Sequence, residues 1–431
     1  MSKFLFLVGC LLSFTLLALA QAPPLDWIDP DTGHRVIRLS REAGSQSLYF
    51  HQNAYSPDGQ KLIITSPSGL STINLKTRAI EKVVDGRVNV IVTGRKSGLV
   101  YYVKDRAVFA THLETKATRE IAKLPPRGSV ASVNADETLL LGSLVEGEAQ
   151  SSYLQGSAPD ARRPAPPEVR GPNGQTLTFA EQKEVRLNAR LEQRLPMALF
   201  TINTQTGELK IIYRATDWLN HLQFSPTDPG QIMFCHEGPW HKVDRIWTIR
   251  TDGIKDGTKD GMGLTKVHTR TMNMEIAGHE FFSADGKTIW YDLQTPRGED
   301  FWVASYVIAT GARTWYHLQR DEWSVHFNVS NDGKLFAGDG GDDEMVAHAK
   351  DGKWLYLFRP EGIPDVAGIK APNANELINP GFFKAERLVN MRKHDYRLEP
   401  NVTFTPDGQW LIFRSNMHGA THVYAVEVRK K

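Results

Sequence analysis

One short unit recurs along this 431-residue chain: an apolar residue, a turn containing Asp-Gly, and then an alternating apolar strand. Hairpin chemistry explains the pattern, because Pro presets the first turn angle, Asp bonds to its own backbone and Gly adopts the positive φ that closes the turn. The clearest copies lie at 55–59, 282–286, 329–333 and 404–408. Degenerate copies begin at Thr93, Val133 and Phe224, which brings the total to seven copies.

The repeat predicts an all-β fold, a seven-bladed β-propeller. Further short strands follow most copies, as at 70–74, 199–203, 245–249 and 422–426, so each unit holds about four strands. A β-sandwich is the alternative, but it would not need so many copies of one unit. Residues 31–39 look like the outer hairpin of a blade without its inner half, so we expect them to complete the last blade and close the ring.

The spacing of the repeat breaks in two places. Residues 145–196 form an insertion whose first part is rich in Pro, Gly and Ser and whose second part, 179–195, is charged and helix-prone. We expect this insertion to lie over one face of the ring. Insertions of this length are often functional, and the alternatives are simple packing and disorder. The second break, 360–394, is expected to be a loop leading into the last blade.

The N-terminus predicts export. Lys3 precedes an apolar run from Phe4 to Ala20 that ends in small residues, which is typical of a signal peptide over residues 1–22 rather than a membrane anchor. The propeller domain then occupies residues 23–431, and the mature protein is periplasmic or secreted. Cys235 would be the only cysteine left, so no internal disulfide is expected. A formal net charge of +2 gives no support for nucleic acid as a partner, and no later segment is apolar for long enough to span a membrane.

Histidines gather in the later units, whereas units one to three carry little chemistry. His221, His279 and His326 each stand shortly before a turn, on the segment that enters a blade. Equivalent positions on different blades of a propeller converge on the central axis, so these side chains are expected to share one pocket. The alternative is that each is an ordinary hydrogen-bonded strand residue, because repeat proteins also keep structural residues in register.

Several segments together resemble the oligogalacturonate lyases, polysaccharide lyase family 22, which are seven-bladed propellers. The resemblance is specific from about residue 217 to the C-terminus. It is carried by Cys-His-Glu-Gly-Pro at 235–239, His-Glu-Phe-Phe at 279–282, Ser-Val-His at 324–326, Gly-Asp-Gly at 338–340 and Phe-Thr-Pro-Asp at 404–407.

The resemblance implies β-elimination at a 4-linked galacturonate, with 4,5-unsaturated products and a role in pectin degradation. It assigns His279 as the base that removes the C5 proton and Arg245 as the residue that holds substrate acid groups. A His titrates near neutral pH, and the planar fork of Arg suits a carboxylate. His221, His236 and Tyr396 are expected to contact the acidic oligosaccharide.

The expected metal ligands depart from the family pattern. His326 matches one metal-binding His, but Glu399 and Asn401 stand where the family has a His-x-His pair, and Tyr396 replaces a Gln. Oxygen ligands favour harder ions, so a divalent cation here is expected to be Mn²⁺, with Ca²⁺ as the alternative. Glu399 could equally contact the sugar, and Tyr396 could protonate the leaving group.

Two other classes of function remain open on the sequence. The changed ligand set is compatible with a lyase or hydrolase for another acidic saccharide. A non-catalytic propeller of the cell envelope, acting as a scaffold or sugar-binding module, would keep the fold without needing His279.

Overall fold

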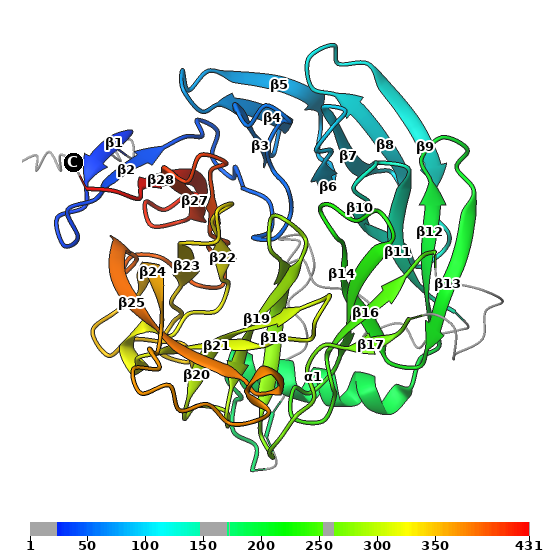
Figure 1. The fold of residues 1–431 in the computed structure, drawn as a ribbon. Coiled ribbons are helices and arrows are strands. Elements are labelled where there is room, and N and C mark those ends of the chain that lie inside the picture. Colours follow the sequence, from blue (N-terminus) through cyan, green and yellow to red (C-terminus); the bar gives the residue numbers. More distant parts are fainter. Residues whose placement is uncertain (1–23, 147–169, 172, 253–262, 431) are drawn as a thin grey trace, which may run out of the picture.

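A computed structural model describes residues 24–146, 170–171, 173–252 and 263–430. The predicted signal peptide, 1–22, lies outside the described residues, as does part of the 145–196 insertion. Strands form six hydrogen-bonded sheets in the described chain, arranged around a centre like the blades of a propeller (Figure 1). The prediction of an all-β ring is confirmed. No helix among the described residues is both long and apolar enough to cross a bilayer.

The first four sheets are antiparallel meanders, and in each the first strand lies nearest the centre (Figure 1). The first sheet contains β3 (Lys61–Ser66), β4 (Gly69–Asn74) and β5 (Ile80–Asp85). The second contains β6 (Asn89–Thr93), β7 (Leu99–Lys104), β8 (Ala107–His112) and β9 (Thr118–Lys123). The third contains β10 (Gly128–Val133), β11 (Leu139–Val145), β12 (Met197–Asn203) and β13 (Leu209–Ala215). The fourth sheet contains β14 (Trp218–Phe224), β15 (Gln231–Glu237), β16 (Ile246–Arg250) and β17 (Thr265–Lys266).

The fifth sheet has eight strands and consists of two meanders joined at their outer edges. Its strand order is β18 (Ile276–Phe282), β19 (Thr288–Gln294), β20 (Phe301–Val307), β21 (Thr314–Leu318), β25 (Asn379–Asn390), β24 (Trp354–Gly362), β23 (Phe336–Asp339) and β22 (Asn328–Val329). The join is the parallel pair β21–β25, which begins with Thr314 opposite Asn379. The expected loop at 360–394 is therefore wrong in part, because β24 extends to Gly362 and β25 occupies Asn379–Asn390.

The sixth sheet closes the ring with strands from both ends of the chain. Its strand order is β1 (Asp26–Ile28), β2 (Arg35–Arg38), β28 (His422–Glu427), β27 (Trp410–Ser415) and β26 (Thr403–Phe404). Val36 pairs with Val426, which confirms the predicted role of the first hairpin. The buried His34 ring bonds the Glu427 carbonyl at 2.8 Å and the Glu386 carboxylate at 3.1 Å, so it ties this hairpin to two other strands.

The predicted turn chemistry is present in all four clear copies. In the first copy the Ser56 hydroxyl donates to the Asp58 carboxylate at 2.6 Å, and Gly59 adopts a φ of 69°. Copies at 283–286, 330–333 and 405–408 repeat both features. In the degenerate copy at 133–137 a non-glycine residue, Glu137, takes the positive φ instead. The repeat therefore determines where each inner strand ends.

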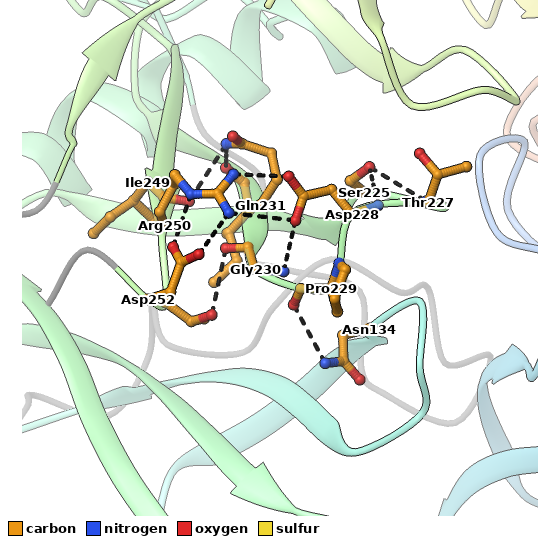
Figure 2. Close-up of polar contacts among 12 residues, drawn as sticks. Asn134, Ser225, Thr227, Asp228, Pro229, Gly230, Gln231, Ile249, Arg250 and Asp252 are labelled. Carbon is orange, nitrogen blue, oxygen red and sulfur yellow. Dashed lines mark hydrogen bonds and ion pairs between the residues drawn. The ribbon is translucent and has the colours of Figure 1, made fainter.

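The degenerate copy at 224–228 is held by a different set of bonds (Figure 2). Arg250 on β16 donates to Asp228 at 2.7 Å and to Asp252 at 2.7 Å. Asn134, in the turn of the preceding sheet, donates to the Pro229 carbonyl at 3.3 Å. This turn lacks Asp-Gly, and it is held instead by an ion pair and by a hydrogen bond from the neighbouring turn.

The insertion separates β11 from β12, which still pair directly, with Val145 opposite Met197. Its helix-prone part forms helix α1 (Phe179–Gln193), as predicted. Thr178 caps its N-terminus and Glu181 completes a capping box, which satisfies backbone N–H groups of the first turn. Two short 3₁₀ helices, Arg320–Glu322 and Ala374–Glu376, lie in loops.

The hydrophobic core lies between neighbouring sheets. Met233 and Ile246 of one sheet pack with Ile289 and Tyr291 of the next, and all four are fully buried. Such packing fixes each inner strand against its neighbours, so residues at equivalent positions face a common centre.

Candidate active site

Two histidines project from bulges at equivalent places on neighbouring inner strands. The pairing of β14 with β15 skips residues between Asn220 and Gln223, and the pairing of β18 with β19 skips residues between Gly278 and Phe281. His221 and His279 occupy these bulges with φ values of 49° and 47°. A bulge re-aims a side chain, and a positive φ at a non-glycine residue is costly and typical of functional sites.

His279 is held by a buried carboxylate. Its Nδ1 lies 3.1 Å from Oδ1 of Asp292 on β19, and the two residues share one hairpin. Because a carboxylate only accepts, Nδ1 carries the proton and Nε2 is left as a proton acceptor. The His279 side chain is 23% exposed whereas that of Asp292 is 6% exposed, so the ring can meet a ligand while its partner cannot.

Arg245, next to β16, lies between two buried carboxylates. Its guanidinium nitrogens are 3.9 Å from Glu237 and 3.9 Å from Glu280, which is too far for good hydrogen bonds. Both Glu280 oxygens and Arg245 Nε are buried without a hydrogen-bond partner among the described residues. Since unpaired buried charge is costly, this arrangement is suited to a polar ligand.

His221 completes this group. Its ring lies 4.0 Å from Glu237 and 3.9 Å from Glu280. Burial lowers the pKa of His221, although both carboxylates act in the opposite direction. Burial alone would raise the pKa of Glu237, but the charges of His221, Arg245 and Lys183 hold it below its usual value.

His326 lies in a second, adjoining pocket organised by Asp339 on β23. The His326 Nδ1 is 3.1 Å from Asp339, the Tyr396 hydroxyl donates to the same carboxylate at 2.8 Å, and the Asn401 N–H donates at 3.1 Å. Burial would lower the pKa of His326, but the charges of Asp339 and Glu399 raise it. Asp339 therefore orients three residues that the sequence distributes over 76 positions from His326 to Asn401.

The two pockets adjoin. The rings of His279 and His326 are 4.9 Å apart edge to face, and His326 Nε2 is 3.7 Å from Glu399. We refer to the connected set as the axial cluster: His221, Glu237, Arg245, His279, Glu280, His326 and Glu399. The expectation that His221, His279 and His326 converge is confirmed.

Part of the site was missed from the sequence. Tyr49, whose ring lies 5.7 Å from that of His326, comes from the segment before β3, so a side chain from the first unit also lies beside the site. In the same segment, burial lowers the pKa of His51 to about 3, with the charges of His221 and His326 adding to the effect. Asp292 and Asp339 were also not assigned roles. The only available signal was their position: each lies on the strand that follows a turn, and a histidine lies on the strand before that turn.

His236 lies apart from the axial cluster. On β15 it alternates with Cys235 and Glu237, so its ring points to the opposite side of the strand. There it bonds Asp217 at 3.1 Å and packs 5.4 Å from the Trp247 ring and 6.1 Å from the Tyr213 ring. Its surroundings are those of a residue between sheets, and its predicted substrate contact stays a prediction.

The residues around His326 fit a divalent cation. His326 Nε2 and Asn401 Oδ1 are both buried without a hydrogen-bond partner in the described part of the chain, and Glu399 is beside them. One nitrogen and two oxygen donors suit a cation of intermediate hardness. No group of three or more His, Cys, Asp or Glu is arranged for metal among the described residues. His326 and Glu399 would supply two ligands, and the buried oxygen of Asn401 would be the third.

A separate hollow lies at the other end of the inner strands. It has a volume of about 680 Å³, part of it open to solvent, and it is lined by His51 and by the turns that follow these strands, including Thr93, Asn134, Ser225 and Ser283. Neither His221 nor His279 lines it. This hollow is therefore distinct from the axial cluster.

Comparison with known proteins identifies the family. The family model described as oligogalacturonate lyase matches residues 193–431, which is more than half of the chain and contains the axial cluster. The chain belongs to the oligogalacturonate lyase family. It is thus an enzyme of the lyase class, with pectin degradation as its function.

Relatives match over nearly the whole length. An oligogalacturonate lyase of Dickeya dadantii and an oligogalacturonide lyase of Pectobacterium atrosepticum are each 24% identical, covering 93% of this chain and 95% of their own. An oligogalacturonate lyase structure from Vibrio parahaemolyticus has a TM-score of 0.70 at 21% identity, covering 94% of this chain and 96% of its own. An oligogalacturonate lyase in complex with manganese has a TM-score of 0.69 at 22% identity with the same coverage. The fold of this family therefore extends beyond the residues that the family model matches.

Proposed function

We propose that this protein cleaves 4-linked galacturonate oligosaccharides by β-elimination, with His279 as the base. The observation that carries the proposal is the position of His279. It is the partly exposed member of a His-Asp pair, its ring lies 4.9 Å from that of His326, and the preceding residue, Gly278, lies against Arg245. Its free Nε2 is suited to accept the C5 proton, while Asp292 stabilises the imidazolium that forms.

Electrostatics explains why the base needs neighbours. The C5 proton stands beside an ionised carboxylate, and its removal places further negative charge on the same group. A cation fixed against that carboxylate stabilises the charge as it develops. Arg245 is suited to this role because its guanidinium is buried and is not hydrogen-bonded tightly to Glu237 or Glu280.

We further propose that His326, Glu399 and Asn401 hold a divalent cation, Mn²⁺ before Ca²⁺. The manganese complex of a structural relative supports this choice, as does the presence of one nitrogen donor. Such an ion supplies a Lewis acid that draws charge from a substrate carboxylate. Asp339 and Tyr396 orient the ligands, since Asp339 fixes the His326 tautomer that leaves Nε2 free.

The test is a turnover assay on oligogalacturonates, with and without added Mn²⁺, in which unsaturated products are read by their ultraviolet absorbance. We expect wild-type protein to form them and His279→Ala to lose at least about a thousandfold in kcat, in the upper range of general-base catalysis. His317→Ala is the matched control because His317 also pairs with an aspartate, at 3.3 Å from Asp300, but on the outer strand β21. Absence of unsaturated product from wild-type protein over a panel of uronides would refute the proposal.

We propose that the molecule is a seven-bladed propeller and that it is exported. Counting the two halves of the eight-stranded sheet separately gives seven blades in one domain, in agreement with the seven turn copies. Residues 1–22 direct export to the periplasm or beyond, where oligogalacturonates would be met. Mass determination of the mature N-terminus after expression in a Gram-negative host tests this, and an intact Met1 would contradict it.

A further inference from the structure

Helix α1 is a fixed part of the molecule, although it belongs to an insertion. Its Glu184 pairs with Arg297 in the loop between β19 and β20, and its Asn188 accepts a hydrogen bond from Lys242 at 2.6 Å. The Arg190 guanidinium stacks 3.8 Å from the Trp218 ring at the start of β14. These contacts attach the helix to the fourth and fifth sheets, the two that carry His221 and His279 (Figure 1).

This docking brings Lys183 beside a loop that joins two members of the axial cluster. Its ammonium lies 5.3 Å from the Trp240 ring, in the loop that separates Glu237 from Arg245. Lys183 therefore lies over the loop between two members of the axial cluster, and its charge is one of those that hold the pKa of Glu237 below its usual value.

Lys183 is available to a ligand. Among the residues that the structure describes, no carboxylate lies within ion-pair distance of its ammonium, and its side chain is half-buried. Arg245, by contrast, is already flanked by Glu237 and Glu280. An oligogalacturonate carries a carboxylate on every sugar, so a site rich in Glu needs further cations to bind more than one of them.

We propose that helix α1 forms one wall of the substrate site and that Lys183 binds the carboxylate of a sugar next to the one that loses its proton. The Trp240 ring beside it supplies an apolar surface for the same sugar. The inference rests on the proposed function, since it takes the acidic oligosaccharide as the ligand. Lys183 thereby favours unesterified over methyl-esterified substrate.

The experiment uses Lys183→Met, which keeps the apolar stem of the side chain and removes the charge. With trigalacturonate we expect KM to rise about tenfold, which corresponds to about 1.4 kcal/mol of binding, while kcat stays within about twofold. With methyl-esterified trimer, KM should be the same in wild type and variant. Arg186→Met is the control, because it removes the same charge from the same helix at a residue that does not lie over Trp240.

A second measurement avoids turnover. Calorimetric titration of trigalacturonate into His279→Ala and into His279→Ala with Lys183→Met should show about tenfold weaker binding by the double variant. Equal affinities, or an equal loss with Arg186→Met, would overturn the role of Lys183. If wild-type protein cleaves oligogalacturonates but Lys183→Met matches it in both assays, only this inference fails. If wild-type protein cleaves none, the proposed function fails, and the titration still decides whether Lys183 binds the acid.

Discussion

The substitution Asp292→Asn tests whether His279 must hold its correct tautomer, because it leaves the histidine itself in place. Asp292 accepts from His279 Nδ1 at 3.1 Å and is nearly fully buried, whereas an Asn amide can present its NH₂ group to the same nitrogen. His279 would then place its proton on Nε2 and could no longer accept one from the substrate. The substitution keeps the shape of the side chain, so the change is chiefly one of tautomer.

The expected size follows from what the pair does. Loss of the correct tautomer in a His-carboxylate pair lowers turnover by about 10²–10⁴-fold, equivalent to about 3–5 kcal/mol in the barrier. Loss of a charge-assisted hydrogen bond costs the fold about 1–3 kcal/mol at most, reduced because His279 is partly exposed. We therefore expect kcat to fall by at least about a hundredfold, KM to stay within about twofold, and the protein to remain folded.

The assay is initial-rate formation of unsaturated product over a range of substrate concentrations, with the thermal midpoint followed by circular dichroism. Asp300→Asn is the matched control, since Asp300 pairs at 3.3 Å with His317 on β21, the outer strand of the same meander. A kcat for Asp292→Asn within about twofold of wild type would refute the assignment of His279 as base. So would a fall in kcat that Asp300→Asn reproduces.

Two further predictions concern the metal pocket and the response to acid. Asn401→Ala should weaken Mn²⁺ binding by more than about tenfold, measured by calorimetry on metal-stripped protein, because it removes one of three donors; unchanged affinity would exclude Asn401 as a ligand. Glu275 lies buried outside the site, and although burial would raise its pKa, hydrogen bonds from His268 and Thr271 hold it below the usual value of 4.5. Its stabilising effect is then present above about pH 4.5 and lost as the pH falls through the lower folded value, so the stability gap between wild type and Glu275→Gln should close on acidification; a gap that is constant with pH would contradict this.

Local sequence predicted much of the fold because turns are local. Each Ser/Thr-x-Asp-Gly unit carries its own hydrogen bond and its own positive-φ glycine, so the position of a hairpin could be read from a few residues. The helix over 179–193 was likewise predictable from its composition. The extension of β24 and β25 was not, because β25 is stabilised partly by pairing with β21, which belongs to another meander.

For the site, too, local features were predictable from the sequence and contacts between blades were not. The sequence by itself determined the repeat and the ring that β2 closes against β28. It also determined the equivalent positions of His221 and His279, because residues at the same position of a repeat lie at the same distance from the propeller axis. Only the tertiary structure decided which carboxylate each histidine meets, that Tyr49 enters from the first unit, that His236 faces away, and that Lys183 of the insertion lies over Trp240. The physical reason is that these contacts join different blades, and their geometry depends on the packing between sheets, which no single stretch of sequence encodes.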